Sequence, residues 1–391
     1  MKKWIKNAAT AVYRRCGIVL FYLFRVFPIK RNKIVVHSSN GMRYGDNARF
    51  LVEYLKKVRP DLDIVWLKAK EADFAVPEGI RIAPYRYSPK REYEMATAKV
   101  WLCTHFFSYF DRKRKGQFIL QTWHGGMGIK KTGLDHEVDA DYRKTLMNNG
   151  RLPDLMTSNC KHLTGVYRNG MHYEGEIMKC GYPRNDLFFR DTTEERKKVF
   201  SYYGLSEETK VLLYAPTYRP GHDDGINRNE DYGMDLERVK KALEAGFGGK
   251  WVVLVRWHPS LMAKKVSGKD FGDTAINVTQ YPDMQELICA ADSLISDYST
   301  CLFDAALRRI PVFTFATDLE EYSRYPGIYY DMRSLPFAFA ESMEELEENI
   351  GGYDQAASDA RWEAFVKDQE LIENGHGTEE IAGRILKEME K

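Results

Sequence analysis

The sequence has no apolar stretch long enough to cross a lipid bilayer. In the N-terminal segment the uncharged apolar run extends only from Gly17 to Phe24, and Arg25 and Pro28 end it. A membrane-spanning helix needs about 20 such residues, and no small-residue cleavage site of a secretory signal follows. An excess of charge is also missing, since 58 basic and 56 acidic residues leave a net charge of +2. With no clustered basic and aromatic face, the chain is not expected to bind nucleic acid.

Motifs for metals, disulfides and common nucleotide cofactors are absent as well. The six cysteines form no CxxC pair and no cysteine–histidine zinc pattern, and they are spread too widely for a disulfide framework. This spacing favours a reducing, cytoplasmic compartment. The sequence contains no Walker motif, no GxGxxG dinucleotide fingerprint and no HExxH zinc motif. We therefore expect neither a cofactor nor a resident metal ion.

Basic and aromatic residues are interspersed in the first thirty residues, MKKWIKNAATAVYRRCGIVLFYLFRVFPIK. This mixture is typical of a helix that lies in the interface of an anionic membrane, where each basic side chain contributes about 1 kcal/mol. The alternative is a helix that packs on the protein and has a solvated basic face. We predict that residues 1–30 form an amphipathic membrane-binding helix and that the protein is peripheral, at the cytoplasmic face of the cell membrane.

The rest of the chain alternates short apolar runs with helical stretches, which predicts an α/β fold. Near-continuous apolar runs form parallel sheets that are covered on both faces. The predicted strands lie at residues 33–39, 63–69, 99–105, 117–123, 210–216, 251–257, 293–299 and 311–316. A length of 391 residues exceeds a usual single core. We therefore predict two doubly wound Rossmann-like domains that face a cleft, at 31–190 and 191–391, with a solvated terminal helix packing back.

Four of the predicted strands end in unusual polar clusters, and ligands of open α/β sheets bind beyond the carboxyl ends of the strands. The first cluster is QTWHGG at 121–126, followed by Lys130 and Lys131. His124 suits a general base because the ordinary pKa of histidine lies near neutrality. Gly125 beside it leaves room for a substrate. The alternative is a structural histidine in a glycine turn.

The second and third clusters combine basic side chains with a hydroxyl. Thr217 and Arg219 follow the strand that Pro216 ends, and they offer a hydroxyl and a planar guanidinium to a phosphate. Arg256 and His258 close the apolar run WVVLV, where a cationic pair could hold a diphosphate. A turn with a surface arginine and a structural histidine are the alternatives.

The fourth cluster precedes a predicted helix at 301–308. Asp297, Ser299 and Thr300 lie at its start, where hydroxyls and backbone N–H groups form a ready phosphate site. An ordinary N-cap is the alternative. The four clusters together predict a shared cleft that carries two histidines, two arginines and a hydroxyl-rich helix start.

Five strings resemble the signature blocks of the CDP-glycerol glycerophosphotransferase family of teichoic-acid synthesis. They are QTWHGG with the following KK, GYPRND at 181–186, APTYR, RWHP and SDYST, and they occur in the family's order and at similar spacing. Weaker similarity extends to residues 44–55, 318–331 and 373–381, so the resemblance covers nearly all of the chain after the N-terminal helix. The family often has threonine-proline after the first histidine-glycine pair, where this chain has glycine and methionine.

The resemblance implies a fold of the glycosyltransferase-B type, with CDP-glycerol as donor and an undecaprenyl-diphosphate-linked saccharide as acceptor. It implies attack on the β-phosphorus, transfer of glycerol phosphate and release of CMP. His124 is then implied as the general base, and His258 with Arg256 as the group that holds the diphosphate. The other implied site residues are Ser299, Thr300, Thr217, Arg219 and Asp297 for the donor, and Lys130, Lys131, Arg184 and Gly125 for the acceptor or a phosphate.

Several alternatives stay open at this point. Within the family, the donor could be CDP-ribitol, and the enzyme could be a polymerase or a capsule transferase in place of a primase. A nucleotide-sugar glycosyltransferase of the same fold would use His124 to activate a sugar hydroxyl. A non-catalytic scaffold with a degenerate site would show no donor turnover.

Overall fold

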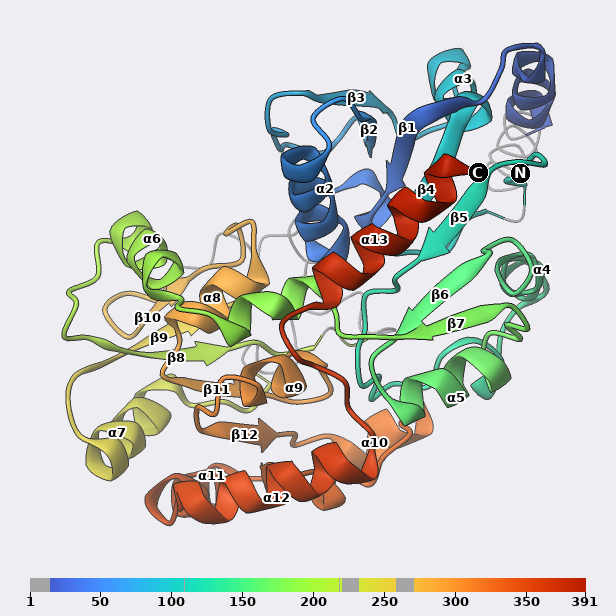
Figure 1. The fold of residues 1–391 in the computed structure, drawn as a ribbon. Coiled ribbons are helices and arrows are strands. Elements are labelled where there is room, and N and C mark those ends of the chain that lie inside the picture. The colour runs from blue at the N-terminus through green and yellow to red at the C-terminus, as the bar shows by residue number, and fades with distance from the viewer. Residues whose placement is uncertain (1–14, 109, 218, 220–231, 258–270) are drawn as a thin grey trace, which may run out of the picture. The chain divides into compact units, whose positions relative to one another are not determined.

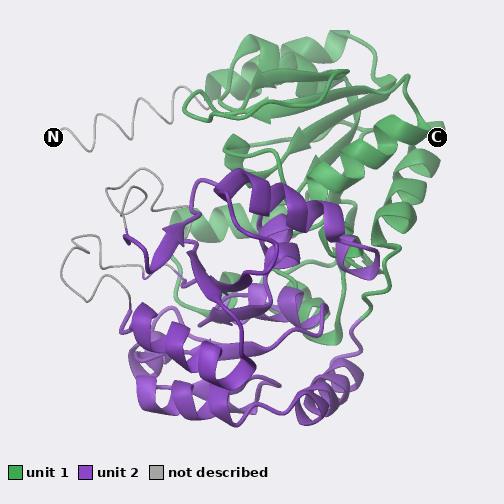
Figure 2. Ribbon diagram, turned by 90° about the vertical axis from the view of Figure 1, so that its left-hand side faces the viewer, with its two compact units in different colours: residues 1–126, 132–186, 372–391 green, residues 127–131, 187–371 purple. Residues whose placement is uncertain are grey.

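The computed structural model describes residues 15–108, 110–217, 219, 232–257 and 271–391. The chain divides into two α/β units, which Figure 2 shows in different colours. Unit 1 comprises residues 1–126, 132–186 and 372–391, and unit 2 comprises residues 127–131 and 187–371. No helix in the described part of the chain has the length and apolar character needed to cross a membrane.

Unit 1 contains a seven-stranded parallel sheet in the order β3-β2-β1-β4-β5-β6-β7 (Figure 1). Its strands are β1 (Lys30–His37), β2 (Asp63–Lys68), β3 (Ile80–Pro84), β4 (Ala98–Cys103), β5 (Phe118–Gln121), β6 (Leu155–Ser158) and β7 (Glu176–Lys179). Successive side chains of a strand point to opposite faces. Ile34 and Val36 accordingly join one core cluster, whereas Val35 joins another. Both faces of β1 are therefore buried, which explains its continuous apolar run.

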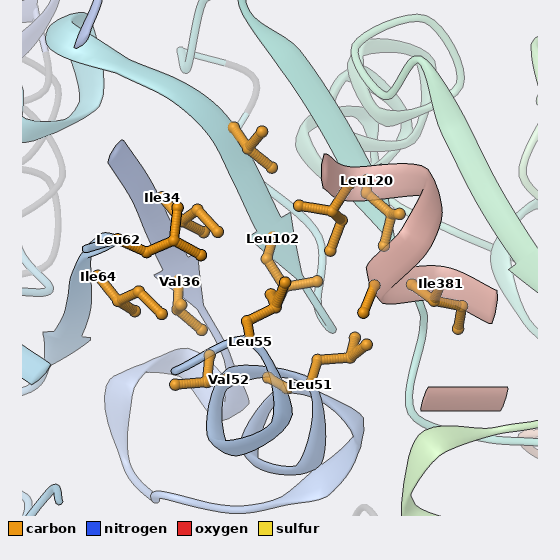
Figure 3. Close-up of a cluster of buried hydrophobic side chains, with 14 of the residues drawn as sticks. Ile34, Val36, Leu51, Val52, Leu55, Leu62, Ile64, Leu102, Leu120 and Ile381 are labelled. Carbon is orange, nitrogen blue, oxygen red and sulfur yellow. The ribbon is translucent and has the colours of Figure 1, made fainter. Parts of the chain in front are cut away.

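Helices from opposite ends of the chain cover one face of this sheet. Leu51 and Leu55 of α2 (Asp46–Val58) pack with Ile381 of α13 (Gly377–Glu390) on the side chains of β1 and β4 (Figure 3). On the other face lies α3 (Pro89–Thr97). The remaining described helices of unit 1 include α4 (Ala140–Asn149) and α5 (Lys161–Asn169).

Unit 2 contains a six-stranded parallel sheet in the order β10-β9-β8-β11-β12-β13 (Figure 1). Its strands are β8 (Lys210–Tyr214), β9 (Trp251–Val255), β10 (Ala275–Asn277), β11 (Ser293–Ser296), β12 (Val312–Phe315) and β13 (Ala338–Ala340). Its described helices include α6 (Thr193–Tyr203), α7 (Leu236–Phe247), α8 (Met284–Ala290), α9 (Cys301–Ala306), α10 (Leu319–Arg324), α11 (Met343–Gly351) and α12 (Gln355–Asp368). Val239 and Leu243 of α7 and Leu346 of α11 pack on β8, β9 and β12 in one core cluster.

Hydrogen bonds hold the C-terminal segment in unit 1. The carboxylate of Glu373 accepts from the side-chain amides of Asn159 and Asn185, at 2.7 and 3.0 Å, and from the backbone N–H of Tyr182 at 3.1 Å. Asp186 accepts from the first two backbone N–H groups of α13, at 3.0 and 2.6 Å, and so caps this helix. The block GYPRND at 181–186 and the family-like segment at 373–381 are therefore in contact, although about 190 residues separate them in sequence.

The structure confirms the α/β fold with parallel sheets and contains all eight predicted strands. Each strand ends one to three residues earlier than predicted. The sequence missed five short strands, β3, β6, β7, β10 and β13. The boundary expected at residue 191 lies close to Leu187, where the main segment of unit 2 begins. Residues 372–391, predicted as the end of the second domain with a terminal helix packing back, group with unit 1, because α13 buries Ile381 and Ile385 in its core.

Two glycines of α13 give a matched stability test. A Cβ atom on Gly377 would lie 2.3 Å from the carbonyl oxygen of Gly181, so that the backbone must move, whereas a Cβ on Gly383 would meet nothing. We expect Gly377→Ala to lower the free energy of unfolding by about 1–3 kcal/mol, as overpacking does. Gly383→Ala should raise it by up to about 1 kcal/mol, because alanine is the better helix former. Urea denaturation measures both, and equal effects of the two changes would contradict the close approach of the two segments.

Candidate active site

His124 follows a sharp change of direction at the carboxyl end of β5. The backbone N–H of Thr122 still bonds to the carbonyl of Cys103, at 2.9 Å, and so extends the ladder with β4 by one residue. Trp123 then adopts a φ of 57°, in the left-handed region that side chains other than glycine and asparagine seldom occupy. Such backbone strain is found preferentially at functional sites. His124 thus directly follows a residue with an unusual backbone conformation.

One hydrogen bond determines which ring nitrogen of His124 can act as a base. Its Nδ1 lies 2.8 Å from the carbonyl oxygen of Thr104, which follows β4. A carbonyl oxygen only accepts, so Nδ1 carries the proton. In the neutral ring the lone pair is then on Nε2, which is the arrangement that a general base requires. His105 stacks on the ring, with centroids 4.0 Å apart and planes 9° apart.

Side chains from distant parts of unit 1 hold the backbone around His124. The guanidinium of Arg184 donates to the carbonyl oxygen of His124 and, at 3.0 Å, to the carboxylate of Asp46. The side-chain amide of Asn47 donates to the carbonyl oxygen of Trp123 at 3.1 Å, and its oxygen accepts from the backbone N–H of Arg184 at 3.3 Å. The structure therefore places Arg184, a predicted phosphate or acceptor candidate, beside His124.

The segment directly after the QTWHGG block belongs to unit 2. The backbone N–H of Lys131 donates to Gly327 at 3.0 Å, and that of Tyr329 donates to Ile129 at 2.8 Å, so an antiparallel bridge forms at Lys130. The Lys130 amine lies 5.9 Å from the centroid of a tyrosine ring, and desolvation lowers its pKa to about 8 in spite of a nearby carboxylate. Lys131 is exposed. The two lysines therefore lie in different environments.

Asp297 connects the ends of β8 and β11 in unit 2. Its carboxylate accepts from the backbone N–H of Thr217, at 2.9 and 3.0 Å, and from the guanidinium of Arg219 at 2.8 Å. Arg219 also donates two parallel hydrogen bonds to Asp318, at 2.6 and 3.0 Å. These ion pairs raise the pKa of Arg219 despite its burial, and the side chain stays charged. The hydroxyl of Thr217 is buried and has no hydrogen-bond partner in the part of the chain that the structure describes.

Three tyrosine rings surround the Arg219 guanidinium. They belong to Tyr232, Tyr298 and Tyr322, at 4.7, 4.9 and 5.0 Å from its carbon to the ring centroids. Tyr298 and Tyr322 also stack on each other at 3.8 Å. With two carboxylates and three rings around it, Arg219 organises this end of the sheet. Its donation to a phosphate stays a prediction.

The structure places the other predicted donor residues in unit 2 as well. Arg256 is buried directly after β9 and donates to the carbonyl oxygen of Tyr281 at 2.8 Å. Ser299 accepts from the backbone N–H of Cys301 at 3.3 Å, as an N-cap does, and the side chain of Thr300 makes no cap bond to α9. The predicted His258 lies outside the described residues.

Sequence reasoning missed several residues that shape these sites. His105 lies at the end of the predicted strand 99–105. Asp318 and Tyr322 lie in the segment 318–331, whose only signal in the sequence is its weak similarity to the family. The contact of His105 with His124 and that of Asp318 with Arg219 join residues 19 and 99 positions apart, so no local pattern reveals them. Within the described parts of the chain, no group of three or more histidine, cysteine or acidic side chains is placed to hold a metal ion.

The fold defines an α/β protein whose candidate site residues lie at the carboxyl ends of two parallel sheets, the edge at which open α/β sheets bind ligands. The chain belongs to the CDP-glycerol:poly(glycerophosphate) glycerophosphotransferase family, whose model matches residues 19–387. This finding confirms the family resemblance of the sequence.

Relatives of known name differ in how much of their length the chain covers. It is 29% identical over 343 residues to a teichoic acid poly(glycerol phosphate) polymerase of Bacillus subtilis. This alignment covers 85% of this chain and 45% of the polymerase. It is 28% identical over 399 residues to a teichoic acid glycerol-phosphate transferase of Staphylococcus aureus, covering 98% of this chain and 100% of that protein. The chain therefore spans about half the length of some relatives, such as the Bacillus subtilis and Staphylococcus epidermidis polymerases, and all of others.

The fold is similar to a solved structure of the wall teichoic acid polymerase TagF. The TM-score is 0.82 at 25% sequence identity, and the match covers 100% of this chain and 97% of that one. The parallel sheets of both units are therefore those of a known transferase fold.

The Arg219 ion cluster can be tested by a change of stability. Arg219→Met would leave the buried carboxylate of Asp297 and the partly buried carboxylate of Asp318 without their cation, and breaking a buried ion pair typically costs about 3–5 kcal/mol. Arg238 of α7 is the matched control, because it also pairs with two carboxylates, Glu344 and Glu347, but at the surface. Arg238→Met should leave the free energy of unfolding in urea nearly unchanged. A loss at Arg219 no larger than that at Arg238 would show that the cluster does not hold unit 2 together.

Proposed function

We propose that this protein transfers glycerol phosphate from CDP-glycerol to an undecaprenyl-diphosphate-linked saccharide in teichoic-acid synthesis. Membership of the family makes it a CDP-polyol type of transferase. The observation that carries the mechanism is the hydrogen bond from Nδ1 of His124 to Thr104, because it leaves the lone pair of the ring on Nε2.

In the proposed reaction His124 acts on the acceptor. Its Nε2 takes the proton of the acceptor hydroxyl, and the oxygen attacks the β-phosphorus, which bears glycerol. The bond from that phosphorus to the bridging oxygen breaks, and CMP leaves with the electron pair as a phosphate. Such a transfer depends on positioning and on positive charge around the diphosphate more than on covalent chemistry.

Unit 2 is the proposed donor side. Arg256 and His258 would hold the diphosphate, with Ser299 and Thr300 beside it. The buried hydroxyl of Thr217 has no partner among the described residues, and a phosphate oxygen would satisfy it. Asp297 and Arg219 would act indirectly, by holding the backbone of Thr217. Lys130 and Arg184 remain candidates for a phosphate or the acceptor, and the KM of each substrate in their variants would assign them.

The relatives support the choice of a CDP-polyol as the donor and leave its polyol and the product open. Glycerol-phosphate and ribitol-phosphate enzymes both match this chain, and they include primases and polymerases. We propose CDP-glycerol because a glycerol-phosphate transferase matches over its full length, and a solved histidine-to-asparagine variant of TagF soaked with CDPG shares the fold. We further propose a primase. Turnover of CDP-ribitol in place of CDP-glycerol would reject the proposed donor. A long polymeric product on gels would reject the proposed primase.

The proposed base can be tested by CMP release from CDP-glycerol in the presence of a lipid-linked disaccharide. His124→Ala should lower kcat by about 10²–10⁴-fold, the usual contribution of a general base, and His258→Ala should also reduce turnover strongly. His376→Gln is the control, since this histidine is exposed in unit 1. Wild-type rates in a folded His124→Ala variant would refute the assignment.

We also propose that the N-terminal segment binds an anionic membrane surface. Residues 1–14 lie outside the described chain, and residues 15–23 are helical. One face of this helix packs on unit 1, where Phe21 contacts Trp101 with ring centroids 6.1 Å apart. Apolar side chains nearby are exposed, among them Val19 (58%), Leu23 (60%) and Val26 (81%). This segment thus has buried apolar residues on one face and exposed apolar residues on another. Such a pattern is typical of a helix that packs on the protein with one face and enters the membrane interface with the other.

Vesicle sedimentation tests this surface. Leu23→Glu combined with Val26→Glu should weaken binding to vesicles that contain phosphatidylglycerol by at least about tenfold, because each replaces a buriable apolar side chain by an anion. Tyr202→Glu is the control, since Tyr202 is equally exposed on unit 2. Equal binding of both variants would place the membrane contact elsewhere.

A further inference from the structure

A second histidine, His105, makes the closest ring contact of the proposed base. Its ring lies parallel to that of His124, with centroids 4.0 Å apart and planes 9° apart. His105 follows β4 and His124 follows β5, and these strands are neighbours in the sheet. The stack is therefore built by two adjacent strand ends.

The hydrogen bonds of His105 define its protonation. The backbone N–H of Ser39 donates to its Nδ1 at 3.2 Å, and the hydroxyl of Thr104 lies 2.8 Å from the same nitrogen. A backbone N–H can only donate, so Nδ1 must carry the lone pair and Nε2 the proton. The two stacked rings therefore have opposite tautomers, since Nδ1 is the protonated nitrogen of His124.

The surroundings keep His105 uncharged. Desolvation by burial lowers the pKa of His105 well below its ordinary value, and His124 and His37 add to this effect. His37, at the end of β1, is itself held neutral, because burial lowers its pKa to about 4. Arg184 and Asp46, the charged pair nearest to the backbone of His124, bond to each other. A neutral ring thus lies against the base.

Further bonds fix the backbone that carries both rings. The side-chain amide of Gln121 donates to the carbonyl oxygen of His105 at 3.1 Å, and its oxygen accepts from the backbone N–H of Trp123 at 3.2 Å. Gln121 therefore ties the loop after β4 to the loop after β5. The loop after β4 carries both Thr104, whose carbonyl oxygen accepts from Nδ1 of His124, and His105, whose ring stacks on His124. This loop therefore sets both the hydrogen bond and the stacking of the base.

We propose that His105 is the positioning residue of His124, holding the imidazole of the base in one plane and in the form that has its lone pair on Nε2. The inference rests on the proposed role of His124. When His124 takes the proton of the acceptor, its ring becomes a cation. The π face of neutral His105 then stabilises this cation, whereas a charged neighbour would repel it.

Kinetics of two variants and a control test the proposal. His105→Ala removes the stacked ring, and a base misplaced by about 1 Å loses on the order of 10²-fold in rate. We expect kcat to fall by about 10–100-fold, with the KM for CDP-glycerol within about twofold of wild type. His105→Phe keeps a neutral stacking ring and should restore kcat to within about fivefold. His376→Gln should have no effect.

A spectroscopic measurement separates this proposal from the proposed function. In ¹⁵N-histidine-labelled full-length protein, His124 should show a protonated Nδ1 and His105 a protonated Nε2 near neutral pH. His105→Ala should shift the His124 signals toward a mixture of both tautomers, and His105→Phe should keep them. If His124→Ala is fully active, the role of the base fails while these signals still report on positioning. If His105→Ala has wild-type kcat and unchanged signals, or if His105→Phe is as slow as His105→Ala, the positioning role is overturned.

Discussion

Both sheets consist of parallel strands, and this constraint decides where polar side chains can lie. The inner strands have helices or loops on both faces, so their side chains must be apolar over most of their length. Polar groups gather where a strand ends and its backbone leaves the ladder. In unit 1 this point is occupied by Thr104, His105 and His124, and in unit 2 by Thr217 and Asp297. The same edge of each sheet therefore collects the groups that can meet a ligand.

Strand ends need partners from elsewhere, because their backbone groups have left the ladder. In unit 2 one carboxylate serves this purpose, since Asp297 binds the backbone of Thr217 and the side chain of Arg219. In unit 1 the carbonyl of Thr104 binds the ring of His124, and Arg184 binds its backbone. A buried polar network of this kind is rigid when every member is satisfied. Rigid placement is what a transfer that depends on positioning requires.

The regular part of the fold could be predicted from the sequence because long apolar runs reveal buried strands. The missed strands are short, such as β10 with three residues and β7 with four, and lack such a run. The acidic and basic residues of the terminal helix predict a solvated element, whereas Ile381, Ile385 and Met389 recur at helical spacing and are buried. Its burial against α2 depends on a contact between opposite ends of the chain. Local patterns carry no information on such contacts.

The candidate site was predicted in its residue types but not in its connections. Strand ends pointed to His124, Thr217 and Arg219, and the structure places each beyond a parallel strand. The sequence offered no sign that Asp297 and Asp318 converge on Arg219 and so give it a structural role in unit 2. The stack of His105 on His124 was equally hidden, because it requires the adjacency of β4 and β5.

The most direct test of the central claim is the mass of a lipid-linked saccharide acceptor after incubation with the protein and CDP-glycerol. We predict that the acceptor gains glycerol phosphate units in the same number as the CMP molecules released, joined through a phosphodiester. An acceptor of unchanged mass, or one that gains a sugar when a nucleotide sugar is supplied, would contradict the account.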